Sequence, residues 1–292
     1  MDTLVFLVAA GLARGSVLAL FAISLVIVWR AARVVNFAQA AMAVVGVYAG
    51  FALTAATGSY WLGVAGAVLT GALLGVLAER GPLRLVPRDN PLPGMIVAIG
   101  LVMVLQAGLA IAFGAAHRPV PAPFPQRPLS LGGVPVLSPY DLFTLATAAV
   151  VMAGLAWMFG RTSLGLQLRA AAFAPETSRL LGVRVGRMVT IGWAVSVAVA
   201  ALAGLLLVPT ELGLSPHAAD ILFVQAFAVA VIGGLDSPPG ALLAGLGVGI
   251  LTSLVTGYVT AAAAPLAVLG LLTAVLLVRP AGLFAAREAR TA

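Results

Sequence analysis

The sequence of 292 residues contains no cysteine and no lysine, and only 9% of its residues are charged. The absence of cysteine excludes disulfides, thiolate metal sites and cysteine nucleophiles. The absence of lysine excludes a phosphate-binding loop, which requires a lysine after its glycines, so the chain is not a conventional ATPase. His117 and His217 stand far apart, without the HExxH frame of a zinc hydrolase, and there is no GxSxG nucleophile elbow. We therefore expect no catalytic residue, no metal site and no cofactor.

Hydrophobic residues make up 62% of the chain, and its mean hydropathy is +1.14. Soluble domains carry about 25% charged residues, so this composition indicates an integral membrane protein. Apolar runs of about 20 residues recur, which predicts an all-α fold: a polytopic bundle of transmembrane helices. The net charge of +7 does not indicate nucleic-acid binding, because the basic residues, all arginine, mostly stand in short loops between apolar runs. The first three residues lack the positive region of a secretory signal, so we expect no cleaved peptide.

The apolar runs predict nine helical stretches. They cover residues 4–29, 36–56, 60–78, 94–114, 140–159, 188–208 and 220–232, followed by two stretches that end at Val278. Because an arginine near mid-span is costly, Arg14 predicts that the first crossing begins near Gly15. The segment 117–139 is rich in proline and is not expected to be helical.

The arginines predict the orientation of the helices. Thirteen of the sixteen lie in loops that fall on one side of the bundle, and the positive-inside rule makes that side cytoplasmic. Segments 117–139 and 209–219 then lie outside. This assignment of loops to sides fits nine crossings with the N-terminus outside. It also fits eight crossings if one early segment is re-entrant. Both alternatives are open.

Residues 161–187 form the most polar segment, with five arginines and one glutamate between long apolar runs. Pro175 suits the first position of a short helix, and Gly182 is placed to end it. Glu176 lies at the positive end of the helix dipole, one turn before Arg179. Two turns are marginal in water, so we expect this helix to bury Leu180 and Leu181 against something. The alternative is a solvated loop.

Two polar residues at the start of the second apolar stretch are candidates for the translocation path. Asn36 and Gln39 are three residues apart and would share a helix face. Hydrogen bonding between helices of the bundle is an equally good interpretation. Asp141 and Asp220 stand near predicted span ends, where a helix-start role is expected, and no proton relay is evident.

Four stretches resemble the permease subunits of ATP-binding-cassette importers for branched-chain amino acids. Residues 35–39 are similar to an asparagine-phenylalanine-alanine-histidine-glycine signature. Gln39 and the following Ala40 stand in place of its last two residues. Residues 169–183 match the cytoplasmic coupling segment, with Ala174 in place of the usual acidic residue. The other two stretches are a glycine-rich signature within 228–245, containing Gly233, Gly234, Asp236 (usually glycine) and Gly240, and a terminal arginine-proline-x-glycine-leucine-phenylalanine at 279–284.

The resemblance implies one permease domain over residues 1–292, of the type II-like importer bundle, in a bacterial inner membrane. It implies two permease subunits, two cytoplasmic ATPases and an extracytoplasmic binding protein that delivers the amino acid. It assigns Pro175, Glu176, Arg179, Leu180, Leu181 and Gly182 to the contact with the ATPase.

Several alternatives remain open at this point. Related members carry urea, short amides or other amino acids. A secondary transporter or channel would also be apolar with arginine-flanked spans, and a membrane-embedded enzyme is a weaker rival. Pairing with a different permease or with a second copy is also undecided.

Overall fold

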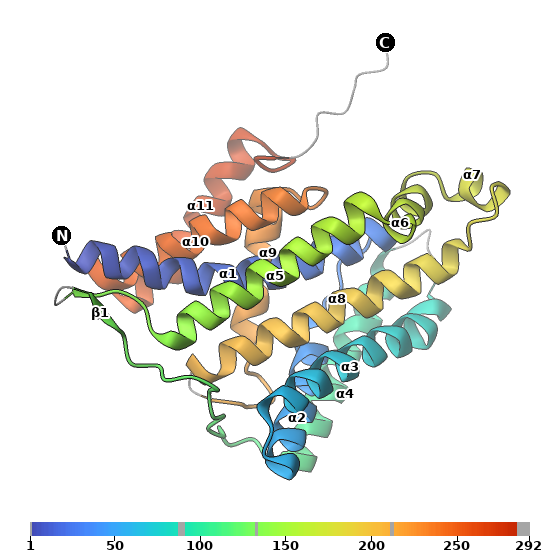
Figure 1. Ribbon diagram of the computed structural model, residues 1–292. Coiled ribbons are helices and arrows are strands. Elements are labelled where there is room, and N and C mark those ends of the chain that lie inside the picture. Colours follow the sequence, from blue (N-terminus) through green and yellow to red (C-terminus); the bar gives the residue numbers. More distant parts are fainter. Residues whose placement is uncertain (1, 87–90, 132–133, 211–212, 285–292) are drawn as a thin grey trace.

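The computed structural model describes residues 2–86, 91–131, 134–210 and 213–284 (Figure 1). Four residues that were used to predict the orientation lie outside the described residues: Arg88, Glu211, Arg287 and Arg290. The helices are α1 (Asp2–Ala32), α2 (Gln39–Thr57), α3 (Tyr60–Arg80), α4 (Pro91–Phe113), α5 (Pro139–Arg161), α6 (Ser163–Phe173), α7 (Pro175–Leu180), α8 (Val185–Leu207), α9 (Asp220–Gly233), α10 (Pro238–Tyr258) and α11 (Ala264–Val278). Short 3-10 turns cover Pro82–Leu85, Val208–Thr210 and Ala261–Ala263.

The expected all-helical membrane fold is confirmed. Eight helices in the described part of the chain are long and apolar enough to cross a membrane, and each of the nine predicted stretches contains a helix. The segment after α4 is not helical, as expected. Its described residues include a small antiparallel hairpin of β1 (Ser130–Leu131) and β2 (Val134–Pro135).

The apolar helix that is too short to cross alone is α9, late in the chain, whereas the eight-crossing alternative placed a re-entrant segment in the early part. It has 14 residues, which at 1.5 Å per residue span only about 21 Å. α1, in contrast, is one continuous helix of 31 residues through Arg14. Arg14 is exposed and precedes the end of α1 by about 27 Å, nearly the thickness of a hydrocarbon core. This separation agrees with a crossing that begins near Gly15.

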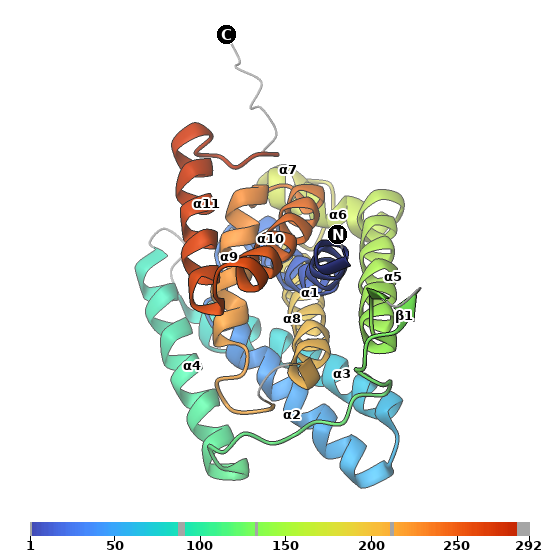
Figure 2. The ribbon, with the colours of Figure 1, turned by 90° about the vertical axis from the view of Figure 1, so that its left-hand side faces the viewer.

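α1 and α8 form the centre of the bundle, with α4 and α5 on opposite flanks (Figure 2). Buried Leu20, Phe21 and Val26 of α1 pack in the main core with Ala203 and Leu206 of α8. The two helices are antiparallel, because the later part of α1 meets the earlier part of α8. The flanking helices expose large apolar side chains along their length, as lipid-facing helices do.

Glycines bring two pairs of helices into close contact. A Cβ on Gly15 of α1 would lie 2.8 Å from the carbonyl oxygen of Gly245 in α10. A Cβ on Gly71 of α3 would lie equally close, 2.8 Å, to the carbonyl oxygen of Val197 in α8. Helices without a hydrophobic driving force between them associate through such small residues. The pairs α1–α10 and α3–α8 are therefore packed backbone against backbone.

The helices α1–α4 and α8–α11 repeat one arrangement. In this repeat α1, α2, α3 and α4 correspond to α8, α9, α10 and α11. The contact of α10 with α1 corresponds to that of α3 with α8, and the contact of α9 with α1 to that of α2 with α8. Likewise, α11 contacts α9 as α4 contacts α2. Since α1 and α8 are antiparallel, the two units are inverted copies. In each unit the second helix is preceded by a non-helical segment, residues 33–38 before α2 and 213–219 before α9. Irregular backbone at membrane depth requires burial in protein, and inverted repeats with broken helices are typical of transporters.

Candidate functional site

The segment 161–187 lies at the end of the bundle opposite the N-terminus, where α6 and α7 connect α5 to α8 (Figure 1). We call this the arginine-rich end, because Arg30, Arg33, Arg169 and Arg279 gather there around one cavity. The sequence reasoning missed α6. Two features of the sequence indicate this helix. One is the N-cap Thr162, whose Oγ1 accepts a hydrogen bond from the Gly165 amide at 3.1 Å. The other is the helical spacing of Leu164 and Leu168.

α7 has the form expected from the sequence. Pro175 occupies the first turn, and Gly182 has φ +84°. The amide of Val183 donates to the carbonyl oxygen of Ser178 at 2.9 Å, and the amide of Gly182 donates to that of Arg179 at 3.0 Å. These two bonds form a Schellman motif, which needs a residue with positive φ after the helix. The motif fixes where the chain leaves α7.

The apolar side chains of this short helix are not covered within the described chain. Leu180 is 89% exposed and Leu181 is 79% exposed, and the preceding Phe173 is equally open. The Glu176 carboxylate pairs with Arg179 at 2.7 Å, beside the leucines in sequence. α7 therefore presents two uncovered leucines with an ion pair next to them. The burial expected for the leucines is not provided by the described residues.

Asn36 and Gln39 do not share a helix face, because Asn36 precedes α2 and Gln39 is its first residue. Both side chains are buried. The Asn36 Nδ2 group donates to Gln39 Oε1 at 2.5 Å, and Asn36 Oδ1 accepts from the Ala38 amide at 3.1 Å. Gln39 Nε2 donates to Ser24 Oγ of α1 at 3.0 Å and to Ser196 Oγ of α8 at 2.8 Å. Gln39 thus joins three helices, and neither residue lines the large cavity described below.

The glycine-rich signature and the terminal motif, nearly fifty residues apart, lie against each other. The amides of Leu283 and Phe284 donate to the carbonyl oxygens of Ile232 and Gly233 at 2.9 and 3.3 Å. A Cβ on Gly282, whose φ is +93°, would lie 2.6 Å from the Cα of Gly234.

The turn between α9 and α10 is equally tight. A Cβ on Gly233 would lie 2.5 Å from the carbonyl carbon of Gly240. Ser237 caps α10 by accepting from the Gly240 amide at 3.1 Å. The glycines of the signature therefore serve close backbone packing, and side chains larger than hydrogen do not fit there.

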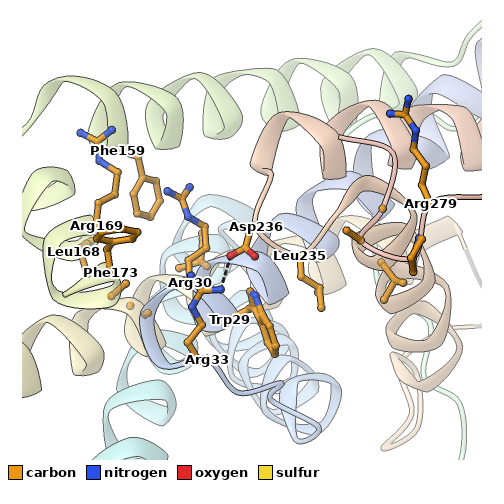
Figure 3. A pocket seen from close by; sticks show the side chains of 18 of the residues that line it. Trp29, Arg30, Arg33, Phe159, Leu168, Arg169, Phe173, Leu235, Asp236 and Arg279 are labelled. Carbon is orange, nitrogen blue, oxygen red and sulfur yellow. Dashed lines mark hydrogen bonds and ion pairs between the residues drawn. The ribbon is translucent and has the colours of Figure 1, made fainter. Parts of the chain in front are cut away.

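Asp236, which replaces a glycine of the signature, forms an ion pair with Arg33 at 2.7 Å. Arg33 follows α1 in the left-handed region, with φ +55°, and this turn directs its side chain toward the α9–α10 loop. Both groups belong to the wall of a cavity of about 1170 Å³ at the arginine-rich end (Figure 3). Apolar side chains, among them Phe159, Leu168 and Leu235, form the rest of its wall.

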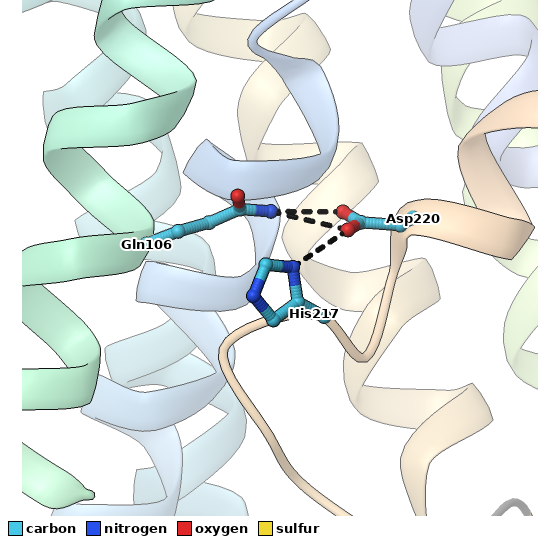
Figure 4. A network of polar contacts seen from close by, with 3 residues as sticks. All are labelled: Gln106, His217 and Asp220. Carbon is cyan, nitrogen blue, oxygen red and sulfur yellow. Dashed lines mark hydrogen bonds and ion pairs between the residues drawn. The ribbon is translucent and has the colours of Figure 1, made fainter. Parts of the chain in front are cut away.

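A second polar group lies toward the opposite end. Gln106 of α4 donates through Nε2 to both carboxylate oxygens of Asp220, at 3.0 and 3.2 Å (Figure 4). His217 Nδ1 lies 2.9 Å from Asp220 Oδ2. Asp220 is the first residue of α9, the helix-start position expected for it. No local pattern predicts the link to Gln106, which ties lipid-facing α4 to the start of the short helix.

The fold defines a multi-pass membrane protein built from inverted repeats of broken helices, the architecture of a transport scaffold. Among the described residues, no group of three or more His, Cys, Asp or Glu side chains could hold a metal ion. The chain belongs to the family of permease components of branched-chain amino acid transport systems, whose model matches residues 7–278.

Curated relatives match over nearly the whole chain. It is 28% identical to the high-affinity branched-chain amino acid transport system permease protein BraD of Pseudomonas aeruginosa, covering 95% of this chain and 94% of that protein. It is also 28% identical to the permease protein LivH of Escherichia coli, with the same two coverages of 95% and 94%. A probable LivH of Methanocaldococcus jannaschii is 26% identical over 85% of this chain and 79% of that protein.

Proposed function

We propose that this chain is the transmembrane permease subunit of an ATP-binding-cassette importer for branched-chain or related hydrophobic amino acids in the cytoplasmic membrane. The family match and the names of the relatives support the substrate class. The whole chain acts as one permease domain. A second permease, two ATPases and an extracytoplasmic binding protein complete the importer, and the arginine-rich end faces the cytoplasm.

The observation that carries the proposal is the pair of uncovered leucines on α7. A cytoplasmic helix with a fixed end and exposed Leu180 and Leu181 is suited to an apolar cleft on an ATPase. Burial of a leucine stabilises such a contact by roughly 1.5–3 kcal/mol, whereas an exposed ion pair contributes about 0–1 kcal/mol. The leucines therefore dominate the docking energy, with Glu176 and Arg179 at its rim.

The test compares Leu180→Asp and Leu181→Asp with Leu85→Asp. Leu85 is the matched control, because it is 85% exposed in the 3-10 turn Pro82–Leu85 after α3 and is not part of α7. ATPase co-purification and leucine uptake should be lost in both α7 variants and kept in the control. Glu176→Ala should weaken both only mildly. Normal ATPase binding and uptake in both α7 variants would make this segment a solvated loop.

The substrate and the energy source require separate measurements. Uptake of leucine, isoleucine and valine by the reconstituted importer should depend on ATP and on the partner ATPases. Competition by urea and short amides tests the related substrates. Uptake by this chain without any ATPase would instead support a secondary transporter or channel.

For Asn36 and Gln39, we infer a role in holding the bundle together and not in contacting the substrate. The hydrogen bonds of Gln39 to α1 and α8 support this inference. The two interpretations predict different phenotypes: substitution lowers stability if the residues pack the bundle, and lowers transport alone if they line the path.

A further inference from the structure

The cavity at the arginine-rich end has an unusual charge. Among the described residues, its wall contains four arginines, Arg30, Arg33, Arg169 and Arg279, but a single carboxylate, that of Asp236. These five groups come from the end of α1 and the residue after it, α6, the α9–α10 loop and the segment after α11. We propose that this cavity binds a phosphate group, carried either by the headgroup of an anionic phospholipid or by a free phosphate.

The single carboxylate leaves two guanidinium groups available. Asp236 pairs with Arg33 at 2.7 Å. Arg279 donates through Nη1 to the carbonyl oxygen of Leu283 at 3.2 Å. Arg30 and Arg169 form no ion pair with any described residue. In Figure 3 Arg30 stands between Arg169 and the Arg33–Asp236 pair. An anion between Arg30 and Arg169 would relieve the repulsion between two positive charges on one wall.

The surroundings of Arg30 favour a phosphate over a zwitterion such as an amino acid. Its guanidinium lies 5.8 Å from the centroid of the Phe159 ring, and Arg30 is partly buried. A guanidinium held on an aromatic face is positioned to bind phosphate oxygens through two parallel hydrogen bonds. A zwitterion carries no net charge, so the excess of positive charge on the wall attracts it less strongly than it attracts a phosphate anion.

The position of the cavity allows both sources of phosphate. Basic pockets between transmembrane helices on the cytoplasmic side bind anionic lipid headgroups. The apolar side chains of Leu168 and Phe173 in its wall suit the start of an acyl chain. The volume of about 1170 Å³ also admits a free phosphate from the aqueous side. The experiment must therefore separate the two sources.

Trp29 provides a local reporter. Its indole Nε1 is buried without a hydrogen-bond partner among the described residues, and the side chain belongs to the cavity wall. The chain has four tryptophans, so the Trp29 signal is obtained as the difference between the unmodified chain and Trp29→Phe. The full chain is placed in nanodiscs of phosphatidylcholine and titrated with inorganic phosphate. A second series replaces part of the lipid with phosphatidylglycerol.

In sulfate-free buffer at constant ionic strength, we expect a saturable change of the Trp29 fluorescence in at least one series. Arg30→Gln and Arg169→Gln should each weaken the response at least tenfold. Arg187→Gln is the matched control, since Arg187 is an exposed arginine of the same end but is not part of the wall. Arg30→Lys keeps the charge without the planar fork and should also weaken binding.

The outcomes separate the sources. A response to inorganic phosphate assigns a free phosphate, and a response to phosphatidylglycerol alone assigns a lipid headgroup. No response in either series overturns the proposal, and so does an equal loss in Arg187→Gln. Should Arg30→Gln fail to fold, Arg169→Gln on the surface helix α6 decides the question.

Discussion

The replacement of Gln39 by leucine distinguishes a packing role from a path role for the polar residues before α2. Leucine has a similar volume and fills the site, so the change removes hydrogen bonds without opening a large cavity. The amide of Gln39 donates to Ser24 Oγ and Ser196 Oγ and accepts from Asn36. All four groups are buried, so no solvent replaces these bonds.

The magnitude follows from the partners that lose a bond. Ser24 Oγ still donates to the Phe21 carbonyl at 2.6 Å, and Ser196 Oγ to the Ser24 carbonyl at 2.7 Å. Asn36 Nδ2 keeps only the weak acceptor Met42 Sδ at 3.6 Å. One buried donor is therefore left nearly unsatisfied, which costs about 1–3 kcal/mol. Gln39→Ala adds a cavity and should cost more, in the range of about 2–5 kcal/mol known for large-to-small core changes.

The assay measures thermal unfolding of the full chain in detergent and transport by the reconstituted importer. Unfolding temperature should fall in the order unmodified, Gln39→Leu, Gln39→Ala, and protein that stays folded should still transport. Gln167→Leu is the matched control, because Gln167 is exposed on α6. Unfolding of Gln39→Leu at the unmodified temperature together with loss of transport would refute the packing role, since that result assigns Gln39 to the path.

Three further predictions concern packing, orientation and energy supply. Gly249→Val should destabilise the chain, because a Cβ there would overlap the backbone of Gly15 in α1, whereas Gly247→Val on the same helix meets nothing within 4 Å and should be tolerated in thermal unfolding. Single cysteines, introduced into this cysteine-free chain, should react with an impermeant reagent from outside at positions 126 and 217 but not at positions 84 and 179; external labelling at position 179 would overturn the orientation. The purified chain should hydrolyse no ATP, since it has no lysine for a phosphate-binding loop, and turnover above background in a preparation free of partner ATPases would contradict this.

The features that the sequence alone determined are those set by local chemistry. Apolar runs must form helices in lipid, which gave the nine helical stretches. α7 followed from Pro175 and Gly182, because φ restrictions act on the residue itself. The arginine distribution predicted which loops share a side, and four arginines from three separate segments meet at one cavity.

The tertiary structure decided what depends on contacts between distant segments. Asn36 and Gln39 fitted a helix face by spacing, but residues 33–38 are not helical, and Gln39 bonds to residues in α1 and α8. The ion pair of Arg33 with Asp236 joins groups 203 positions apart, and only the fold brings them together. α9 is shorter than a span, and its first residue, Asp220, accepts a hydrogen bond from Gln106 of α4, a partner that no local pattern specifies. Local propensity acts over a few residues, whereas these contacts require that the whole bundle has formed.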